Sequence, residues 1–287
     1  MEPLIRNISD TARWVAVYRA QETERRDAVF RDPFARALAG ERGAQIAAAT
    51  PFMQEAAWAM IARTYLVDQI VEGEVRRGVD LIVNLAAGLD TRPYRMELPP
   101  ALRWVEVDLP EILDYKESIL ADAAPHCALE RVRLDLSGAD ARRAFFDRLG
   151  RSAAHALVIS EGLVIYLEAA EVSALARDLA GVPTFERWAL DIASPGLLTM
   201  MQKRMGSMVA NAGAPYRFAP AEGPPFFAPL GWTPIEVRSL LKTAGRLKRL
   251  SGFLRLVALL PDSTGAQGAR PWSGVCLLAN SAAHRPA

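Results

Sequence analysis

The spacing of apolar residues along the chain changes character near residue 80. Before that point, apolar side chains recur every three or four residues among charged ones, which predicts helices with one apolar face. After it, short runs rich in Val, Leu and Ile alternate with helical stretches, the pattern of strand–helix–strand units in a largely parallel sheet. We therefore predict an α/β fold, with an N-terminal helical cap over residues 1–78 and an α/β core over residues 79–194.

The short apolar runs give the strands expected in the core: Leu81–Leu85, Trp104–Val107, Val132–Leu134, Ala156–Ile159 and Trp188–Ile192. The helical stretches between them give the helices expected at Pro110–Ala121, Ala139–Leu149 and Ala169–Ala180. After the interruption described next, residues 233–287 are expected to complete the core. They contain a predicted helix near Pro234–Ala244 and two late strands, which suit an antiparallel edge, around Arg246–Leu250 and Val275–Ala279.

Residues 195–232 interrupt this rhythm, and we predict that they form an inserted lid. Met201, Met205 and Met208 follow the spacing that places side chains on one face of a helix. Methionine adapts its shape to apolar partners, so this face is a candidate roof for an apolar pocket, together with Phe218, Phe226 and Phe227. Ordinary helix packing is the alternative.

Composition limits the partners and the cellular location that we expect for the protein. The chain has 287 residues, of which 51% are hydrophobic and 23% charged, as is usual for globular proteins. A net charge of +1 gives no reason to expect a nucleic-acid partner. No apolar run approaches the ~20 residues that span a bilayer, and the first residues lack a signal-peptide pattern. We therefore expect a cytoplasmic protein without a membrane partner. Two cysteines are too few for a disulfide framework or a zinc site.

Small and acidic residues follow the predicted strands. Gly88 lies just after the first strand, where the missing Cβ lets the backbone approach a ligand closely. Asp108, Asp135 and Glu161 end the following strands. Ligands of open α/β sheets bind at the carboxyl ends of the strands, and carboxylates accept strong hydrogen bonds from ribose hydroxyls. Each acidic residue has an alternative role as a helix cap. Together they favour a nucleoside-like ligand that carries positive charge.

A nicotinamide dinucleotide is the competing ligand. Its binding turn carries three glycines, G-x-G-x-x-G. In this chain Ala86, Gly88 and Thr91 stand at those positions, so two of the three glycines are missing. Asp90 would also repel a pyrophosphate. A sulfonium suits the acidic strand ends better.

The motifs resemble the leucine carboxyl methyltransferase family, specifically its bacterial branch of S-adenosylmethionine-dependent O-methyltransferases. The resemblance covers most of the chain and rests on motifs in a fixed order: Arg25–Ala35, Ala62–Thr64, Ala87–Arg92, Glu106–Pro110, Asp135–Leu136 and Glu161–Leu167. It implies a class I methyltransferase fold, which is a Rossmann-like sheet of about seven strands behind an N-terminal helical cap. It also implies S-adenosylmethionine as the cofactor.

The resemblance further implies a role for each matched residue. Arg63 is expected to contact the carboxylate of the methionine moiety, with Gly88 beneath that moiety. Asp108 is expected to hold the ribose. Asp135 and Leu136 would flank the adenine, and Glu161 would lie near the methionine amino group. Where the family has a first glycine, this chain has Ala86, whose methyl group would crowd the cofactor if the position requires a positive φ.

The sequence leaves the methyl acceptor open. The three histidines, His126, His155 and His284, are not expected at the carboxyl ends of the strands. No metal-ligand spacing is present in the sequence. This favours a carboxylate acceptor, which needs no general base, or a hydroxyl deprotonated by a tyrosine or an acidic side chain.

Three residues are candidates for contact with the acceptor. Tyr166 falls where the family has a tyrosine close to the acceptor, although a buried aromatic side chain with a satisfied hydroxyl is the alternative. Arg19 and Arg31 of the cap are candidates to pair with an acceptor carboxylate.

We therefore expect an enzyme that methylates an oxygen of a small-molecule acceptor. Two alternatives stay open. One is a protein that binds S-adenosylmethionine or S-adenosylhomocysteine without catalysis, and the other is a methyltransferase acting on the carboxyl terminus of a protein.

Overall fold

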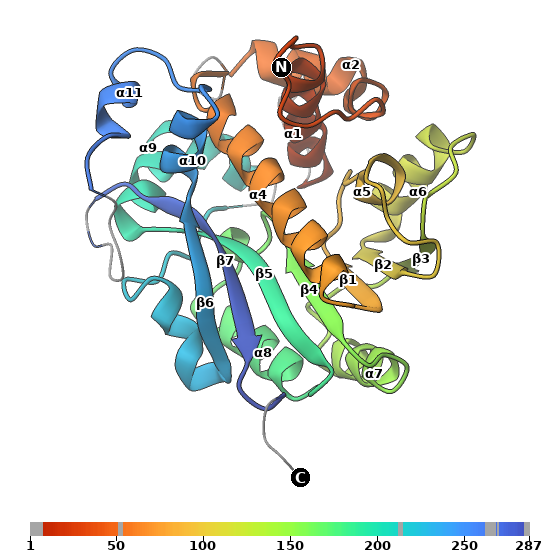
Figure 1. Ribbon diagram of the computed structural model, residues 1–287. Helices are drawn as coiled ribbons and strands as arrows, with labels where there is room; N and C mark the ends of the chain where they lie inside the picture. The colour runs from red at the N-terminus through yellow and green to blue at the C-terminus, as the bar shows by residue number, and fades with distance from the viewer. Residues whose placement is uncertain (1–7, 51–53, 212–214, 262–267, 269, 284–287) are drawn as a thin grey trace.

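The computed structural model describes residues 8–50, 54–211, 215–261, 268 and 270–283. Within these residues, seven strands form a single sheet in the order β3-β2-β1-β4-β5-β7-β6 (Figure 1). Strands β1 to β5 pair in parallel, whereas β7 is antiparallel to both β5 and β6. This confirms the predicted α/β fold with a mostly parallel sheet and an antiparallel edge.

Most strands lie close to their predicted positions: β1 (Leu81–Leu85), β2 (Arg103–Asp108), β4 (Ala156–Ser160), β5 (Phe185–Ala193) and β7 (Ser273–Asn280). Strand β3 (Ala128–Arg133) begins earlier than the apolar run that predicted it. It is an edge strand without a fully buried residue, so its own side chains give no apolar run. Of the apolar residues that predicted the strand, Val132 lies in β3 and Leu134 follows it.

The prediction for residues 234–250 is wrong. Strand β6 (Trp232–Ser239) lies where most of the helix near Pro234–Ala244 was expected, and helix α10 (Leu240–Arg246) covers only the end of that range. No strand forms at Arg246–Leu250, where α10 ends and a turn follows. Strand β6 is the other edge of the sheet, and its residues alternate between more and less exposed positions. Short edge strands of this kind carry few consecutive apolar residues. Ser239 ends the strand and caps α10 by accepting a hydrogen bond from the Lys242 amide at 3.3 Å.

Helices cover both faces of the sheet. On one face, α4 (Ala57–Arg76) and α10 pack against strand residues that include Trp104 and Leu157. The other face is covered by α7 (Ala139–Gly150), α8 (Ala169–Ala180) and the 3-10 helix η2 (Pro224–Leu230). Helix α4 therefore belongs to a layer of the core, although the predicted cap of residues 1–78 includes it. Helix α6 (Pro110–Ile119) packs against α2 (Ala35–Ala48) at the β3 side of the sheet.

The phenylalanines of the predicted lid lie in the second of these faces. Phe218, Phe226 and Phe227 pack edge to face on one another, and Phe227 also meets Trp188 of β5 with ring centroids 5.3 Å apart. Because this cluster supports the sheet, the prediction that these rings roof a pocket is wrong. Apolar rings pack where they lose most contact with water, and this sheet face buries more of their surface than the roof of a pocket would.

The remaining helices gather where the parallel strands end, at the top of Figure 1. They are α1 (Ile8–Thr23), α2 (Ala35–Ala48), α5 (Arg92–Arg95), α9 (Pro195–Asn211), α11 (Leu254–Val257) and the 3-10 helix η1 (Val164–Tyr166). Helices α1 and α2 pack against each other and reach over the strand ends. Among the described residues, no helix is long and apolar enough to span a membrane.

Candidate active site

A cavity of about 830 Å³ lies between the ends of the parallel strands and the helices above them. Most of the predicted site residues line this cavity: Arg19, Arg63, Gly88, Asp108, Asp135, Leu136, Glu161 and Tyr166. The strand ends supply its polar side. Helices α1, α4 and α9, with η1, supply a mostly apolar side.

The turn after β1 is held by the carboxylate at the end of β2. The Gly88 amide donates a hydrogen bond of 2.6 Å to Oδ2 of Asp108, and the Leu109 amide donates one of 2.7 Å to Oδ1. A carboxylate has about four acceptor sites, so Asp108 retains capacity for ligand hydroxyls. Burial raises the pKa of Asp108, and the two amide hydrogen bonds partly offset that rise.

Ala86 adopts a left-handed backbone conformation, with φ of +51°, and Gly88 has φ of +50°. Glycine adopts this conformation freely, whereas an L-residue with a Cβ loses roughly 1–2 kcal/mol there. Position 86 therefore has the positive φ at which the methyl group of Ala86 was expected to crowd the cofactor. Ala86 also lines the cavity.

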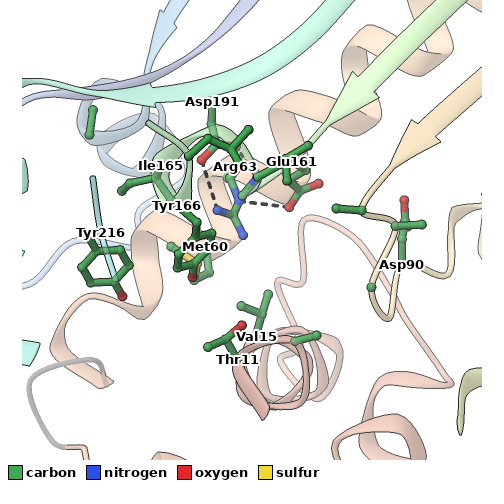
Figure 2. A pocket seen from close by; sticks show the side chains of 18 of the residues that line it. Thr11, Val15, Met60, Arg63, Asp90, Glu161, Ile165, Tyr166, Asp191 and Tyr216 are labelled. Carbon is green, nitrogen blue, oxygen red and sulfur yellow. Dashed lines mark hydrogen bonds and ion pairs between the residues drawn. The ribbon is translucent and has the colours of Figure 1, made fainter. Parts of the chain in front are cut away.

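Arg63 of α4 reaches between two carboxylates at neighbouring strand ends (Figure 2). Its Nε lies 3.0 Å from Oε1 of Glu161, and its Nη1 lies 3.2 Å from Oδ2 of Asp191. The other oxygen of Asp191 accepts the Gly162 amide at 2.6 Å. A Cβ at Gly162 would stand 3.2 Å from Nη1 of Arg63, so this glycine makes room for the guanidinium.

The two carboxylates that pair with Arg63 keep its guanidinium positively charged. Burial alone would lower its pKa, but Asp191 and Glu161 raise the pKa above its usual value. Within the described part of the chain, Nη2 of Arg63 donates no hydrogen bond, so this edge of the guanidinium is open to a ligand carboxylate.

A second arginine also forms an ion pair with Glu161. Arg92 of α5 lies 2.9 Å from Oε2 of Glu161, 2.8 Å from Oδ2 of Asp90 and 2.6 Å from Oδ1 of Asp68. Its side chain is 3% exposed, and buried charges are tolerated only with such partners. Asn84 of β1 also donates to Asp90, at 2.8 Å. Burial alone would raise the pKa of Glu161, but the charges of Arg92 and Arg63 hold that pKa below its usual value.

Asp191 was not among the predicted site residues, and no individual role was predicted for Arg92 or Asn84. Asp191 lies near the end of β5, so the rule that found acidic residues after the other parallel strands would have found it. Arg92 and Asn84 flank the glycine turn, but nothing in their spacing shows that their side chains turn inward to Asp90.

Tyr166 lies in the apolar half of the cavity. Its ring stacks on Tyr216, with centroids 5.5 Å apart and planes at 29° (Figure 2). Burial raises the pKa of Tyr166, partly offset by the charge of Arg63 and by hydrogen bonds with Thr11 and Tyr216. A hydroxyl whose pKa lies above its usual value is protonated at neutral pH. Around the two rings lie apolar side chains of the cap, among them Trp14, Val15, Met60, Ile165 and Met201.

Of the two cap arginines predicted to contact the acceptor, Arg19 lines the cavity and Arg31 does not. Arg19 lines the cavity, but its Nε pairs with Asp32 at 2.8 Å and its Nη2 donates to the Leu89 carbonyl at 2.5 Å. Asp32 also accepts from the Thr91 hydroxyl at 2.7 Å. Arg19 thus ties the cap to the glycine turn. Arg31 is exposed, donates to the Thr23 carbonyl at 2.8 Å and does not line the cavity, so the predicted contact with an acceptor is wrong for Arg31.

Two described histidines lie outside the cavity: His126 contacts the Met96 carbonyl and His155 contacts Glu186. His284 and the side chains of Met205 and Met208 lie outside the described residues. In the described part of the chain, no group of His, Cys, Asp and Glu side chains is arranged to hold a metal ion. Cys127 and Cys276 are buried free thiols away from the cavity.

Comparison with known proteins gives this cavity its context. A profile of the leucine carboxyl methyltransferase family matches residues 12–180, which is more than half of the chain. The chain belongs to this family. The methyltransferase uses S-adenosylmethionine as its methyl donor.

Two bacterial proteins illustrate the relationship, and both are assigned as S-adenosyl-L-methionine-dependent methyltransferases. One, from Streptomyces coelicolor, is 35% identical over 203 residues, covering 66% of this chain and 70% of the relative. The other, from Streptomyces avermitilis, is 33% identical over 214 residues, covering 71% and 74%. Among solved structures, a DUF574 family protein from Streptomyces avermitilis superimposes with a TM-score of 0.59 at 16% identity, over 92% of this chain and 96% of that one. This last likeness concerns the fold alone.

The residues of the cavity suit the cofactor of the family. Acceptor capacity on Asp108 suits ribose hydroxyls, and the open edge of Arg63 suits a carboxylate. The strand ends add the carboxylates of Glu161 and Asp191, which attract a ligand carrying an ammonium and a sulfonium.

Proposed function

We propose that the methyltransferase methylates a carboxylate oxygen of a small molecule whose body is apolar. The observation that carries this proposal is the contrast within one cavity. Its strand-end half holds paired charges. Its cap half is mostly apolar, and its described residues include no histidine and no tyrosine with a lowered pKa.

In this proposal the strand-end half holds the cofactor. Asp108 accepts hydrogen bonds from the ribose, and Arg63 pairs with the methionine carboxylate. Glu161 lies near the amino group, Gly88 lies beneath the methionine moiety, and Asp135 and Leu136 flank the adenine. When bound, S-adenosylmethionine supplies an electrophilic methyl group on a sulfonium.

The cap half holds the acceptor. A carboxylate is already deprotonated at neutral pH, so it accepts a methyl group without a general base. Tyr166, kept neutral by burial, donates a hydrogen bond that orients the acceptor. The apolar walls exclude water and position the acceptor, and positioning alone contributes as much as ~7–11 kcal/mol in well-oriented reactions.

The test measures turnover as the release of S-adenosylhomocysteine. The enzyme is given S-adenosylmethionine and a library of apolar carboxylic acids, phenols and a peptide with a free carboxyl terminus. We expect methyl esters of the carboxylic acids, at a kcat that does not rise between pH 6 and pH 9, because no group near the acceptor must lose a proton in that range. Phenol methylation with a rate that rises with pH would contradict the carboxylate proposal. Turnover of the peptide alone would favour a protein substrate. Cofactor binding without any turnover would favour the non-catalytic alternative.

A further inference from the structure

The most exposed large apolar side chains of the described residues cluster in one short segment. Phe253 is 75% exposed, Leu256 62%, Leu259 80% and Leu260 60%. All four lie in or beside α11, which stands at the outer edge of the molecule near α9 and α10 (Figure 1). Single exposed apolar residues are ordinary, but a cluster of this kind marks a contact surface.

The charged residues between positions 240 and 260 are all basic, and the next acidic residue in the sequence is Asp262. Residues 240–260 hold five basic residues and no acidic residue. Arg249 is buried and paired with Glu22, and Lys242 donates to main-chain carbonyls. Arg246, Lys248 and Arg255 are exposed, and they pair with no carboxylate among the described residues. The apolar cluster therefore stands among three cations whose charge is available to a partner.

We propose that this segment, which we call the α11 surface, docks on a lipid bilayer that contains anionic headgroups. Apolar side chains that insert into the interface and cations that meet anionic lipids are the two contributions that hold peripheral proteins on membranes. A second copy of the chain suits this surface less well, because a two-fold interface would bring the same three cations together. The expectation of no membrane partner rested on the lack of a spanning segment, and a surface-bound segment needs none.

The position of the α11 surface relates it to the cavity. Leu254, the neighbour of Phe253, lines the cavity, as does Leu240 at the start of α10. A protein docked through α11 would hold its cavity beside the bilayer, where apolar carboxylic acids concentrate. Docking itself does not depend on the identity of the methyl acceptor.

The test is co-sedimentation of the full chain with vesicles made of phosphatidylcholine alone or of equal parts phosphatidylcholine and phosphatidylglycerol. We expect binding to the mixed vesicles only, weakened by added salt. The variant Arg246→Gln/Lys248→Gln/Arg255→Gln should bind them about a hundredfold more weakly, since each cation near an anionic surface contributes roughly a factor of five. The variant Phe253→Ser/Leu256→Ser/Leu259→Ser should lose at least about tenfold.

The matched control is Ile235→Ser/Val237→Ser, which removes two exposed apolar side chains from β6, 48% and 46% exposed. It should bind the vesicles as the wild type does. All three variants should keep the wild-type affinity for S-adenosylhomocysteine, which shows that they are folded. Failure of the wild type to bind the mixed vesicles would overturn the proposal, as would equal loss in the β6 control. Light scattering that shows a wild-type dimer, lost in the Phe253 variant, would assign the surface to self-association instead.

Discussion

The two halves of the cavity are built from different parts of the chain by different means. The strand-end half takes its residues from the turns after parallel strands, and every charged group in its centre has a partner, as with Arg63 between Glu161 and Asp191. The cap half takes its residues from helices separated by up to two hundred positions, such as Val15 and Met201. Sheet geometry fixes the first half, and helix packing fixes the second. Substitutions in the strand-end half should therefore change stability and cofactor affinity, whereas substitutions in the cap half should change acceptor binding.

The largest effect, on the free energy of unfolding, is expected from the buried ion pairs of the strand-end half. Arg92→Met leaves Asp68, Asp90 and Glu161 with one cation fewer in a buried place, and breaking such a set costs about 3–5 kcal/mol. Urea unfolding should show this loss of free energy of unfolding. Arg133→Met is the matched control, since Arg133 is exposed and pairs with exposed carboxylates, so it should change the unfolding midpoint little. Equal losses in the two variants would contradict the special status of the buried set.

Acidification should remove stability from the same half. Burial alone would raise the pKa of Asp90 and of Glu161, but the charge of Arg92 lowers both below their usual values. Groups with a lowered folded-state pKa stabilise the fold at neutral pH, and this stabilisation is lost as pH falls below about 4, through the folded-state values. The free energy of unfolding should fall across that range in the wild type and fall less in Arg92→Met. An unchanged acid slope in the variant would contradict the pairing.

The next effect concerns the cofactor. Asp108→Ala should weaken S-adenosylhomocysteine binding roughly tenfold or more, since hydrogen bonds to charged groups contribute about 1.5–3 kcal/mol. Calorimetric titration measures this directly. Asp114→Ala, which removes a carboxylate from the exposed side of α6, should leave the affinity unchanged. Unchanged affinity in the Asp108 variant would remove the ribose assignment.

A smaller effect is expected in the cap half. Met201→Ala shortens an apolar side chain that lines the cavity beside Tyr216. It should raise KM for the acceptor about fivefold, as expected for the loss of roughly 1 kcal/mol of apolar contact, and leave cofactor affinity unchanged. A single substitution is the appropriate test, because removal of the whole segment would also remove Phe218 and Phe227 from the core. Equal loss of cofactor and acceptor binding would break the division into halves.

The smallest effect is expected at the glycine turn. Ala86→Gly relieves the left-handed strain of about 1–2 kcal/mol, while the added freedom of the unfolded chain costs about 0.5–1 kcal/mol. The net gain in free energy of unfolding should be about 1 kcal/mol or less, measurable as a small rise in the urea midpoint. Destabilisation in this variant would mean that the methyl group packs favourably where it stands.

These comparisons also explain how much the sequence could predict. The buried parallel strands gave continuous apolar runs, so β1, β2 and β4 were located closely, and Asp108 and Glu161 followed from their positions after these strands. The edge strands β3 and β6 gave no such run, because water faces part of each strand. Arg31 was misplaced because it lies in the connection between α1 and α2, where the sequence has no periodicity that shows which way a side chain points. Contacts such as Tyr166 with Tyr216 join segments fifty residues apart and have no local pattern.

The central claim is that the strand-end half of this cavity holds the methyl donor. A crystal structure of the chain with S-adenosylhomocysteine tests it most directly. We expect the ribose hydroxyls within hydrogen-bond distance of Asp108, the adenine between Asp135 and Leu136, and the amino-acid carboxylate at Arg63, while the cap half stays open for the acceptor. A ligand seated instead among Trp14, Met60 and Tyr216, with Asp108 untouched, would contradict the account.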